Sequence, residues 1–146
     1  MAKNFAHYNP YGHPNFVTSL PSFEGLNIIA SLVDFPLNLI GSVTFDGHPV
    51  SRAGRIYSIS VRLSAPRIAG TLTVRFSING VAVVGTEVVI DGVNPQSNFA
   101  IFTVPVVGSN FVANDRLGFT VSTTLGWLPI TADIVVAPEV LYDDYL

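Results

Sequence analysis

The chain has 146 residues, of which 49% are hydrophobic and 12% are charged, with a net charge of −3 and no cysteine. This length suits one domain with a substantial core, and the charged fraction is about half of the roughly 25% that is typical of soluble domains. So few charges leave large apolar areas to meet something other than water, which predicts a permanent oligomer or a docked position in an assembly. The one lysine and six arginines form no basic run, so nucleic-acid partners are disfavoured, and disulfides and thiolate metal sites are excluded.

The longest apolar stretch, residues 26–45, is interrupted by Asn27, Asp34, Pro36 and Asn38. A membrane-spanning helix needs about 20 largely uninterrupted apolar residues, so the sequence predicts no membrane span. Near the N-terminus no apolar segment follows a basic start, and we therefore expect no secretory signal.

Residues 1–41 differ in composition from the rest of the chain. Six of the sixteen aromatic residues and four of the ten prolines lie there, without the periodicity of a helix or a strand. Disordered tails are usually poor in aromatic residues and rich in charge, so we expect an extended N-terminal arm that lies on a partner or wraps its own domain. The rings predicted to fill pockets on a partner are Phe5, Tyr8, Tyr11, Phe16 and Phe23.

From about residue 43 onward, apolar and polar residues alternate with a period of two, as they do in strands with one buried face. The two clearest stretches predict these inward-facing sets: Tyr57, Ile59, Val61 and Leu63 in the first, and Leu72, Val74, Phe76 and Ile78 in the second. Asn79–Gly80 follows directly and predicts a tight type I′ turn, which needs positive φ at both central residues.

Further strands are expected at 97–106, 116–124 and 130–140. Six or seven short strands with turns at regular spacing indicate an all-β fold, a jelly-roll β-sandwich over residues 42–146 that follows the arm at 1–41. Residues 26–33 fit either one short helical face or a buried strand.

Two stretches resemble a β-sandwich domain that is common in bacteriophage structural proteins. They read AGRIYSISVRLSAPRIAGTLTVRFSINGVAV (53–83) and FVANDRLGFTVSTTLGWLPITADIVV (111–136). The chain is similar, over roughly residues 42–140, to the tips of tail and head fibres, to small capsid-associated proteins and more broadly to trimeric jelly rolls of the tumour-necrosis-factor-like type. The resemblance implies a homotrimer in which one sheet of each jelly roll packs around a threefold axis. Relatives usually carry Gly-Asp where this chain has Asn114-Asp115, and asparagine can adopt the left-handed conformation that such a turn needs.

Candidate catalytic and metal-binding residues form no established pattern. His7, His13 and His48, with Asp46, lack the spacing of a known metal site, and no G-x-S-x-G motif is present. The carboxylates stand at or near turns and strand ends, where they can cap backbone amides, and no two are placed on one face for glycoside cleavage. We expect no enzyme activity, no metal and no cofactor.

The only tryptophan, Trp127, stands in the loop between the last two expected strands. Its ring could contact a sugar or a receptor, or it could pack at a subunit interface or under the edge of the sandwich. The apolar neighbours Leu125, Leu128 and Pro129 favour packing.

Together these points predict a non-enzymatic virion structural protein, a trimeric capsid decoration or cement protein on the particle surface that is assembled in the host cytoplasm. Its arm and its apolar surface would dock on the major capsid protein or on another virion protein. The alternative is the host-receptor or glycan-binding tip of a phage head or tail fibre, in which the far loops, including the one at Trp127, meet a host-surface glycan. An oligomeric enzyme or a secreted signalling-type jelly roll is a third hypothesis, and the missing secretory signal counts against the latter.

Overall fold

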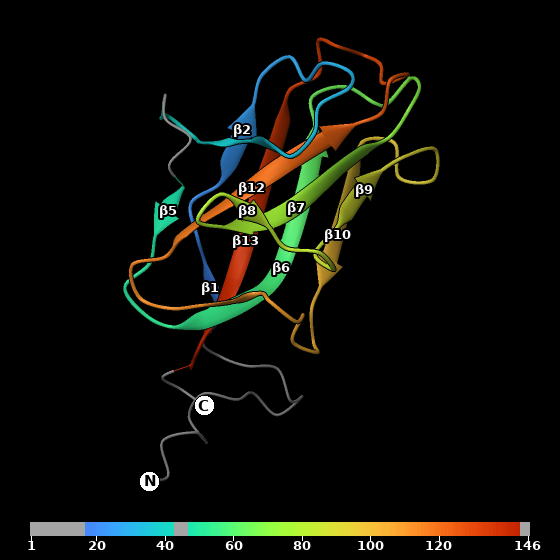
Figure 1. The fold of residues 1–146 in the computed structure, drawn as a ribbon. Helices are drawn as coiled ribbons and strands as arrows, with labels where there is room; N and C mark the ends of the chain where they lie inside the picture. The colour runs from blue at the N-terminus through green and yellow to red at the C-terminus, as the bar shows by residue number, and fades with distance from the viewer. Residues whose placement is uncertain (1–16, 43–46, 144–146) are drawn as a thin grey trace, which may run out of the picture.

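A computed structural model of the chain describes residues 17–42 and 47–143. This part of the chain is all-β and contains no helix. Its strands, drawn in Figure 1, are β1 (Val17–Ser19), β2 (Phe23–Gly25), β3 (Phe35–Pro36), β4 (Asn38–Leu39), β5 (His48–Pro49), β6 (Gly54–Leu63), β7 (Leu72–Ile78), β8 (Val81–Ala82), β9 (Val88–Ile90), β10 (Ser97–Ile101), β11 (Asn110–Phe111), β12 (Arg116–Thr123) and β13 (Ile134–Tyr142).

The first sheet has the strand order β10–β6–β13–β2–β4, with all neighbours antiparallel. β1 continues the line of β2 along one edge of β13, and β11 continues the line of β10 along β6. The longest pairing joins β6 to β13, from Leu63 opposite Ile134 to Gly54 opposite Tyr142. This pair forms the centre of the sheet.

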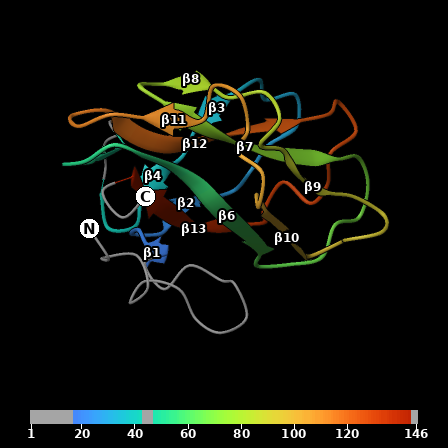
Figure 2. The same cartoon turned by 90° about the horizontal axis from the view of Figure 1, so that it is seen from below.

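The second sheet has the order β3–β12–β7–β8, with β5 also beside β12 and β9 also beside β7. Figure 2 shows β7 and β12 in one layer and β6 and β13 in the other. The chain crosses repeatedly between the layers: β6 lies in the first sheet, β7 in the second, β10 in the first, β12 in the second and β13 in the first. This arrangement is a jelly roll, and the predicted fold class is confirmed.

The core lies between the two sheets and is filled by the inward-facing side chains of the long strands. Phe23 of the first sheet packs edge to face against Phe119 of the second, with ring centroids 5.2 Å apart, and Phe119 lies 5.8 Å from Phe76. All three rings are fully buried. Aromatic pairs of this kind contribute about 0.5–1.5 kcal/mol beyond their buried area, so these rings help to hold the two sheets together.

The predicted inward-facing sets are largely confirmed. Ile59, Val61 and Leu63 of β6 are buried, and so are Leu72, Val74 and Phe76 of β7. Tyr57 differs, because Glu139 pairs with Ser58 and Val140 pairs with Ile56, which leaves Tyr57 without an opposite residue. One extra residue in a strand makes a β-bulge, and the bulge places Ile56 in the core instead of Tyr57.

Both predicted turns adopt the expected backbone. Asn79 and Gly80 have φ values of +51° and +83°, as a type I′ turn requires, and Asn114 has a φ of +75°. The other expected strands are present with shifted ends: β10 covers only the first half of 97–106, and β13 begins at Ile134 and not at residue 130. In the described ranges no helix is long and apolar enough to cross a membrane.

Residues 17–42 differ from the expected arm. β1, β2 and β4 belong to the first sheet and β3 to the second. The edge of β13 that faces away from β6 carries backbone groups in need of partners, and Val17–Ser19 and Phe23–Gly25 supply them. The sandwich therefore begins at β1 and not after residue 41. Residues 26–33 form neither the helix nor the strand that their sequence allows, but a loop between β2 and β3.

The described part of the chain enters and leaves the sandwich at the same end, because Val17 pairs with Leu141. The loops at 26–34, 64–71 and 124–133 lie at the opposite end (Figure 1). The sandwich thus has one end at which the described chain begins and ends, and one end far from these points.

Candidate interaction surfaces

Most of the aromatic residues predicted to bind a partner lie outside the described residues. These are Phe5, Tyr8, Tyr11 and Phe16. Their role stays a prediction.

Phe23, the fifth predicted contact, has a different place. Its side chain is completely buried on β2 and packs against Phe119. β2 pairs with β13, so the alternation of the sheet turns Phe23 inward and Glu24 outward. The expectation that Phe23 fills a pocket on a partner is therefore corrected, because its ring belongs to the core of its own sandwich.

Trp127 is also buried, with 1% of its surface exposed. Its indole Nε1–H donates a hydrogen bond of 3.1 Å to the carbonyl oxygen of Ile28, in the loop after β2. The ring therefore packs under the end of the sandwich and joins two loops far apart in sequence, and it does not present itself as a loop contact. The exposed side chains beside it are Leu125, at 87%, and Leu128, at 45%.

The outer face of the first sheet carries large exposed apolar side chains. Phe99 and Ile101 of β10 are 66% and 53% exposed, and Val135 of β13 is 41% exposed. A shallow hollow of about 480 Å³ lies on this face. We call it the apolar outer face and define it by these residues: Ser60, Arg62, Ser97, Phe99, Ile101, Val135 and Ala137.

Three charged side chains accompany this apolar surface, and one of them is Glu24 of β2, which pairs with Val135. The Arg62 side chain has no ion pair or hydrogen bond in the described part of the chain, and its residue is exposed. Glu139, on the same face of β13, accepts a hydrogen bond of 2.6 Å from Ser58 Oγ. The face thus combines aliphatic and aromatic area with one unpaired cation.

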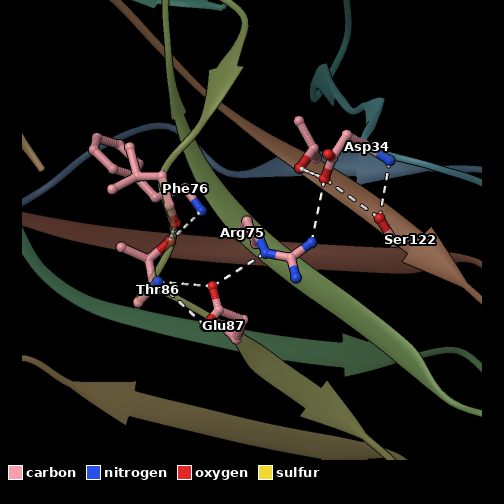
Figure 3. A network of polar contacts seen from close by, with 9 residues as sticks. Asp34, Arg75, Phe76, Thr86, Glu87 and Ser122 are labelled. Carbon is pink, nitrogen blue, oxygen red and sulfur yellow. Dashed lines mark hydrogen bonds and ion pairs between the residues drawn. The ribbon is translucent and has the colours of Figure 1, made fainter. Parts of the chain in front are cut away.

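The outer face of the second sheet carries a network of ion pairs and hydrogen bonds (Figure 3). Arg75 of β7 forms ion pairs with Asp34, at 3.3 Å, and with Glu87, at 3.1 Å. The Asp34 carboxylate also accepts hydrogen bonds from Thr120 Oγ1 and Ser122 Oγ, at 3.3 and 3.4 Å. We call this network, centred on Arg75, the polar outer face.

Local turns hold both carboxylates of the polar outer face in place. Thr86 Oγ1 accepts the backbone N–H of Phe76 at 3.0 Å and donates to the carbonyl of Val83 at 2.7 Å. Glu87, the next residue, accepts the backbone N–H of Gly85, while the backbone N–H of Asp34 donates to Ser122 Oγ at 2.9 Å (Figure 3). Arg75 and its two carboxylates therefore satisfy each other, whereas Arg116 of β12, on the same side of the sheet, is exposed and has no side-chain partner in the described part of the chain.

A third surface is a groove of about 350 Å³ at the open edge of the sandwich, beside β2, β3 and β4. Leu26 and Ile29, 67% and 52% exposed, contribute much of its apolar lining. The groove is defined by these residues: Glu24, Gly25, Leu26, Asn27, Ile28, Ile29, Leu32, Phe35, Pro36 and Asn38.

Three of the carboxylates predicted to cap backbone amides do so, Asp91, Asp115 and Asp133, whereas Asp34 accepts hydrogen bonds from side chains. Asp91 accepts the backbone N–H groups of Asn94 and Val93, and these bonds lower the pKa of its carboxyl group. Asp115 accepts the backbone N–H of Val112 and the side-chain amide of Asn79, which lowers its pKa in the same way. Hydrogen bonds to the charged form have this effect. Their role in turn structure accounts for both groups without catalysis.

The histidine considered for a metal site, His48, lies on β5, where burial lowers the pKa of its imidazole. His7, His13 and Asp46 lie outside the described residues. Within those residues, no three histidine or carboxylate side chains are grouped so as to hold a metal ion. The expectation of no metal and no enzyme activity stays a prediction.

Sequence reasoning did not single out the apolar outer face or the groove. A signal for the first was present, because β10 and β13 are apolar at both odd and even positions, as in Phe99-Ala100-Ile101 and Ile134-Val135-Val136. Strands that are apolar on both sides are typical of sheets covered on both faces. No such signal exists for the groove, whose lining depends on how the loop after β2 folds back.

No protein-family model matches the chain, and no curated protein sequence matches it. The likeness to phage jelly rolls therefore depends on the residues quoted above.

Proposed function

We propose that the chain is a non-enzymatic structural protein that works as a homotrimer docked on a larger assembly, a decoration or cement protein of a virion. The observation that carries this proposal is the apolar outer face. A monomer would leave Phe99, Ile101 and Val135 in water on one face of a sheet, and exposed apolar side chains gathered on one face mark interaction sites.

The apolar outer face suits contact between copies of the chain. Its strands β10, β6 and β13 are consecutive neighbours in one hydrogen-bonded sheet, so the face is ready for association without rearrangement. Arg62 has no partner in the described part of the chain, and burial of an unpaired arginine is costly. Glu139 on the same face offers a carboxylate, so contact between copies can supply the acceptor that Arg62 lacks.

We assign docking on the assembly to the N-terminal segment, residues 1–16. Residues 1–16 carry Phe5, Tyr8, Tyr11 and Phe16 and precede β1, which lies at the end of the sandwich where the chain also leaves it. Three such segments from one trimer would act together, and their effective concentration would multiply weak contacts.

Two measurements test the proposal. The mass of the purified full chain in solution should be three times that of the 15.6 kDa chain, and a stable monomer would contradict the trimer. Removal of residues 1–16 should leave the trimer intact and abolish binding to the particle, seen by electron microscopy of purified particles. Retained binding without these residues would contradict their assigned role.

The second candidate is a receptor-binding or glycan-binding tip, and one observation favours it. The loops far from the termini are joined by backbone hydrogen bonds, such as Leu128 N–H to Ala69 O and Ile28 N–H to Ala132 O, at 3.0 and 2.9 Å. They carry the exposed side chains of Leu125 and Ile130. Binding of the chain to host cells that is lost when both are replaced by serine would support this candidate.

A further inference from the structure

Two hydrogen-bond acceptors that have no donor lie at one end of the groove beside β2, β3 and β4. Glu24 of β2 and Asn38 of β4 stand directly opposite each other in the sheet, so their side chains share one face. The Glu24 carboxylate has no ion pair or hydrogen bond in the described part of the chain. The Asn38 side-chain oxygen is shielded from water and also lacks a hydrogen-bond partner. Buried acceptors are nearly always paired in folded proteins, so the Asn38 oxygen indicates a missing donor, and the partly exposed Glu24 carboxylate beside it can share that donor.

The rest of the groove is apolar. Leu26, Ile29 and Phe35 are each at least 44% exposed and line it together with Leu32 and Pro36. Its volume of about 350 Å³ falls at the lower end of the range for ligand sites, about 300–1,000 Å³. The occupant therefore combines an apolar body with a charged donor at one end.

Hydrogen bonds fix the loop that forms the walls. The backbone N–H groups of Asn27 and Leu32 donate to Asp133 Oδ1 and to Thr123 Oγ1, both at 2.9 Å. Ile28 N–H donates to the carbonyl of Ala132 at 2.9 Å. A site held in this way loses little conformational freedom on binding.

The surrounding charges leave Glu24 available. Asp34, near the far side of the groove, is engaged by Arg75, and Asp133 by the backbone of Asn27. The nearest arginine in the same cross-strand row is Arg62, two strands from Glu24 with Val135 between them. Strands lie about 4.8 Å apart, so Arg62 is roughly 10 Å away and forms no ion pair with Glu24.

We propose that this groove binds a lysine side chain of a partner protein, flanked by apolar residues. The four-carbon stem lies along Leu26, Ile29 and Phe35, and the ammonium group meets the Glu24 carboxylate and, after a rotation of its carboxamide, the Asn38 oxygen. A lysine ammonium has three donors and no acceptor, which matches the Glu24 carboxylate and the Asn38 oxygen. This assignment goes beyond the proposed function and does not depend on the trimer.

The test uses two short peptides that differ in one group. Acetyl-Leu-Lys-Leu-amide and its norleucine analogue, which lacks the ammonium, are titrated into the full-length chain while amide NMR signals are recorded. The chain carries Lys3→Gln, so that its only lysine does not compete. We expect saturable shifts at Gly25, Asn27 and Leu32 with the lysine peptide, and binding at least tenfold weaker with the norleucine peptide, because charge-assisted hydrogen bonds are lost.

Two variants separate binding from folding. Glu24→Gln should weaken binding of the lysine peptide about tenfold and leave the NMR spectrum of the free protein unchanged. The control Glu139→Gln, outside the groove, should leave the affinity for this peptide unchanged. Asn38→Leu should weaken binding and raise the melting temperature, because it removes an unpaired buried oxygen. Equal affinity for both peptides, or no effect of Glu24→Gln, would overturn the proposal. Binding of n-butylamine without binding of the peptide would overturn the protein partner in favour of a small amine.

Discussion

The two outer faces of the sandwich have opposite chemistry, although both belong to strands with the same inward alternation. On the first sheet, Phe99 and Val135 face outward and Arg62 has no partner in the described part of the chain. On the second sheet, Arg75 joins two carboxylates, and hydroxyl groups of β12 complete the network. Both sheets contribute side chains to the same core. Burial of these side chains therefore does not explain why the outward-facing side chains of the two sheets differ.

This difference supports the apolar outer face as the proposed contact with another protein. A charged network that is satisfied within the chain gains little from a partner and loses hydration when it is covered. An apolar face with an unpaired arginine gains from coverage, provided that the partner brings an acceptor. The charged residues are therefore not spread evenly over the surface, and the apolar outer face is one area that has few of them.

The largest effect is expected from a charge placed in the apolar outer face. Phe99→Asp should reduce the mass in solution from that of a trimer to that of the monomer, because a buried carboxylate without a partner opposes association. Sedimentation measures the mass. Thr73→Asp, on the outward side of β7, is the matched control and should remain trimeric. A trimeric Phe99→Asp protein would show that this face is not the contact between copies.

The next effect concerns the core that the two faces share. Phe23→Ala should lower the free energy of unfolding by about 3–5 kcal/mol, because the ring is completely buried and joins the two sheets through Phe119. Urea unfolding is measured in the Phe99→Asp background, so that dissociation of subunits makes no contribution. Unchanged stability would return Phe23 to the set of partner contacts predicted from sequence.

The sequence predicts local features of this fold well. Alternation identified the buried side chains of β7, and the Asn79–Gly80 pair and Asn114 predicted turns whose positive φ values the structure contains. Each of these features depends on a few neighbouring residues and on the stereochemistry of asparagine and glycine.

Features that depend on distant partners were not predictable in this way. Phe23 is buried because β2 pairs with β13, more than a hundred residues later, and its local sequence shows no strand period. The bulge at Tyr57 depends on the register opposite Glu139 and Val140. Glu24 and Asn38 become neighbours only when β2 and β4 pair, so the composition of residues 1–41 suggested an arm where the structure has the edge of a sheet.

A smaller effect is expected from the polar outer face. Arg75→Met should lower the free energy of unfolding by about 0.5–1 kcal/mol, the upper range for partly exposed ion pairs. The difference should shrink at high salt, because partly exposed pairs are screened. Arg62→Met on the opposite face is the control and should leave stability unchanged in the Phe99→Asp background. If the two variants lost the same stability, the contrast between a paired and an unpaired arginine would be wrong.

The smallest effect is expected at Asp115, which lies at a strand end and belongs to neither face. Hydrogen bonds from Val112 N–H and Asn79 lower the pKa of this carboxyl group in the folded state, so its contribution is fully present above the unfolded pKa, about 3.9, and is lost as the pH falls through the folded pKa. Asp115→Asn should therefore lower the melting temperature slightly at pH 7, with a difference that shrinks below about pH 4. Glu24→Gln, whose carboxylate has no partner in the described part of the chain, should match the unchanged protein at pH 7. A difference for Asp115→Asn that persisted undiminished at low pH would show that loop packing, and not the charge of the cap, makes the contribution.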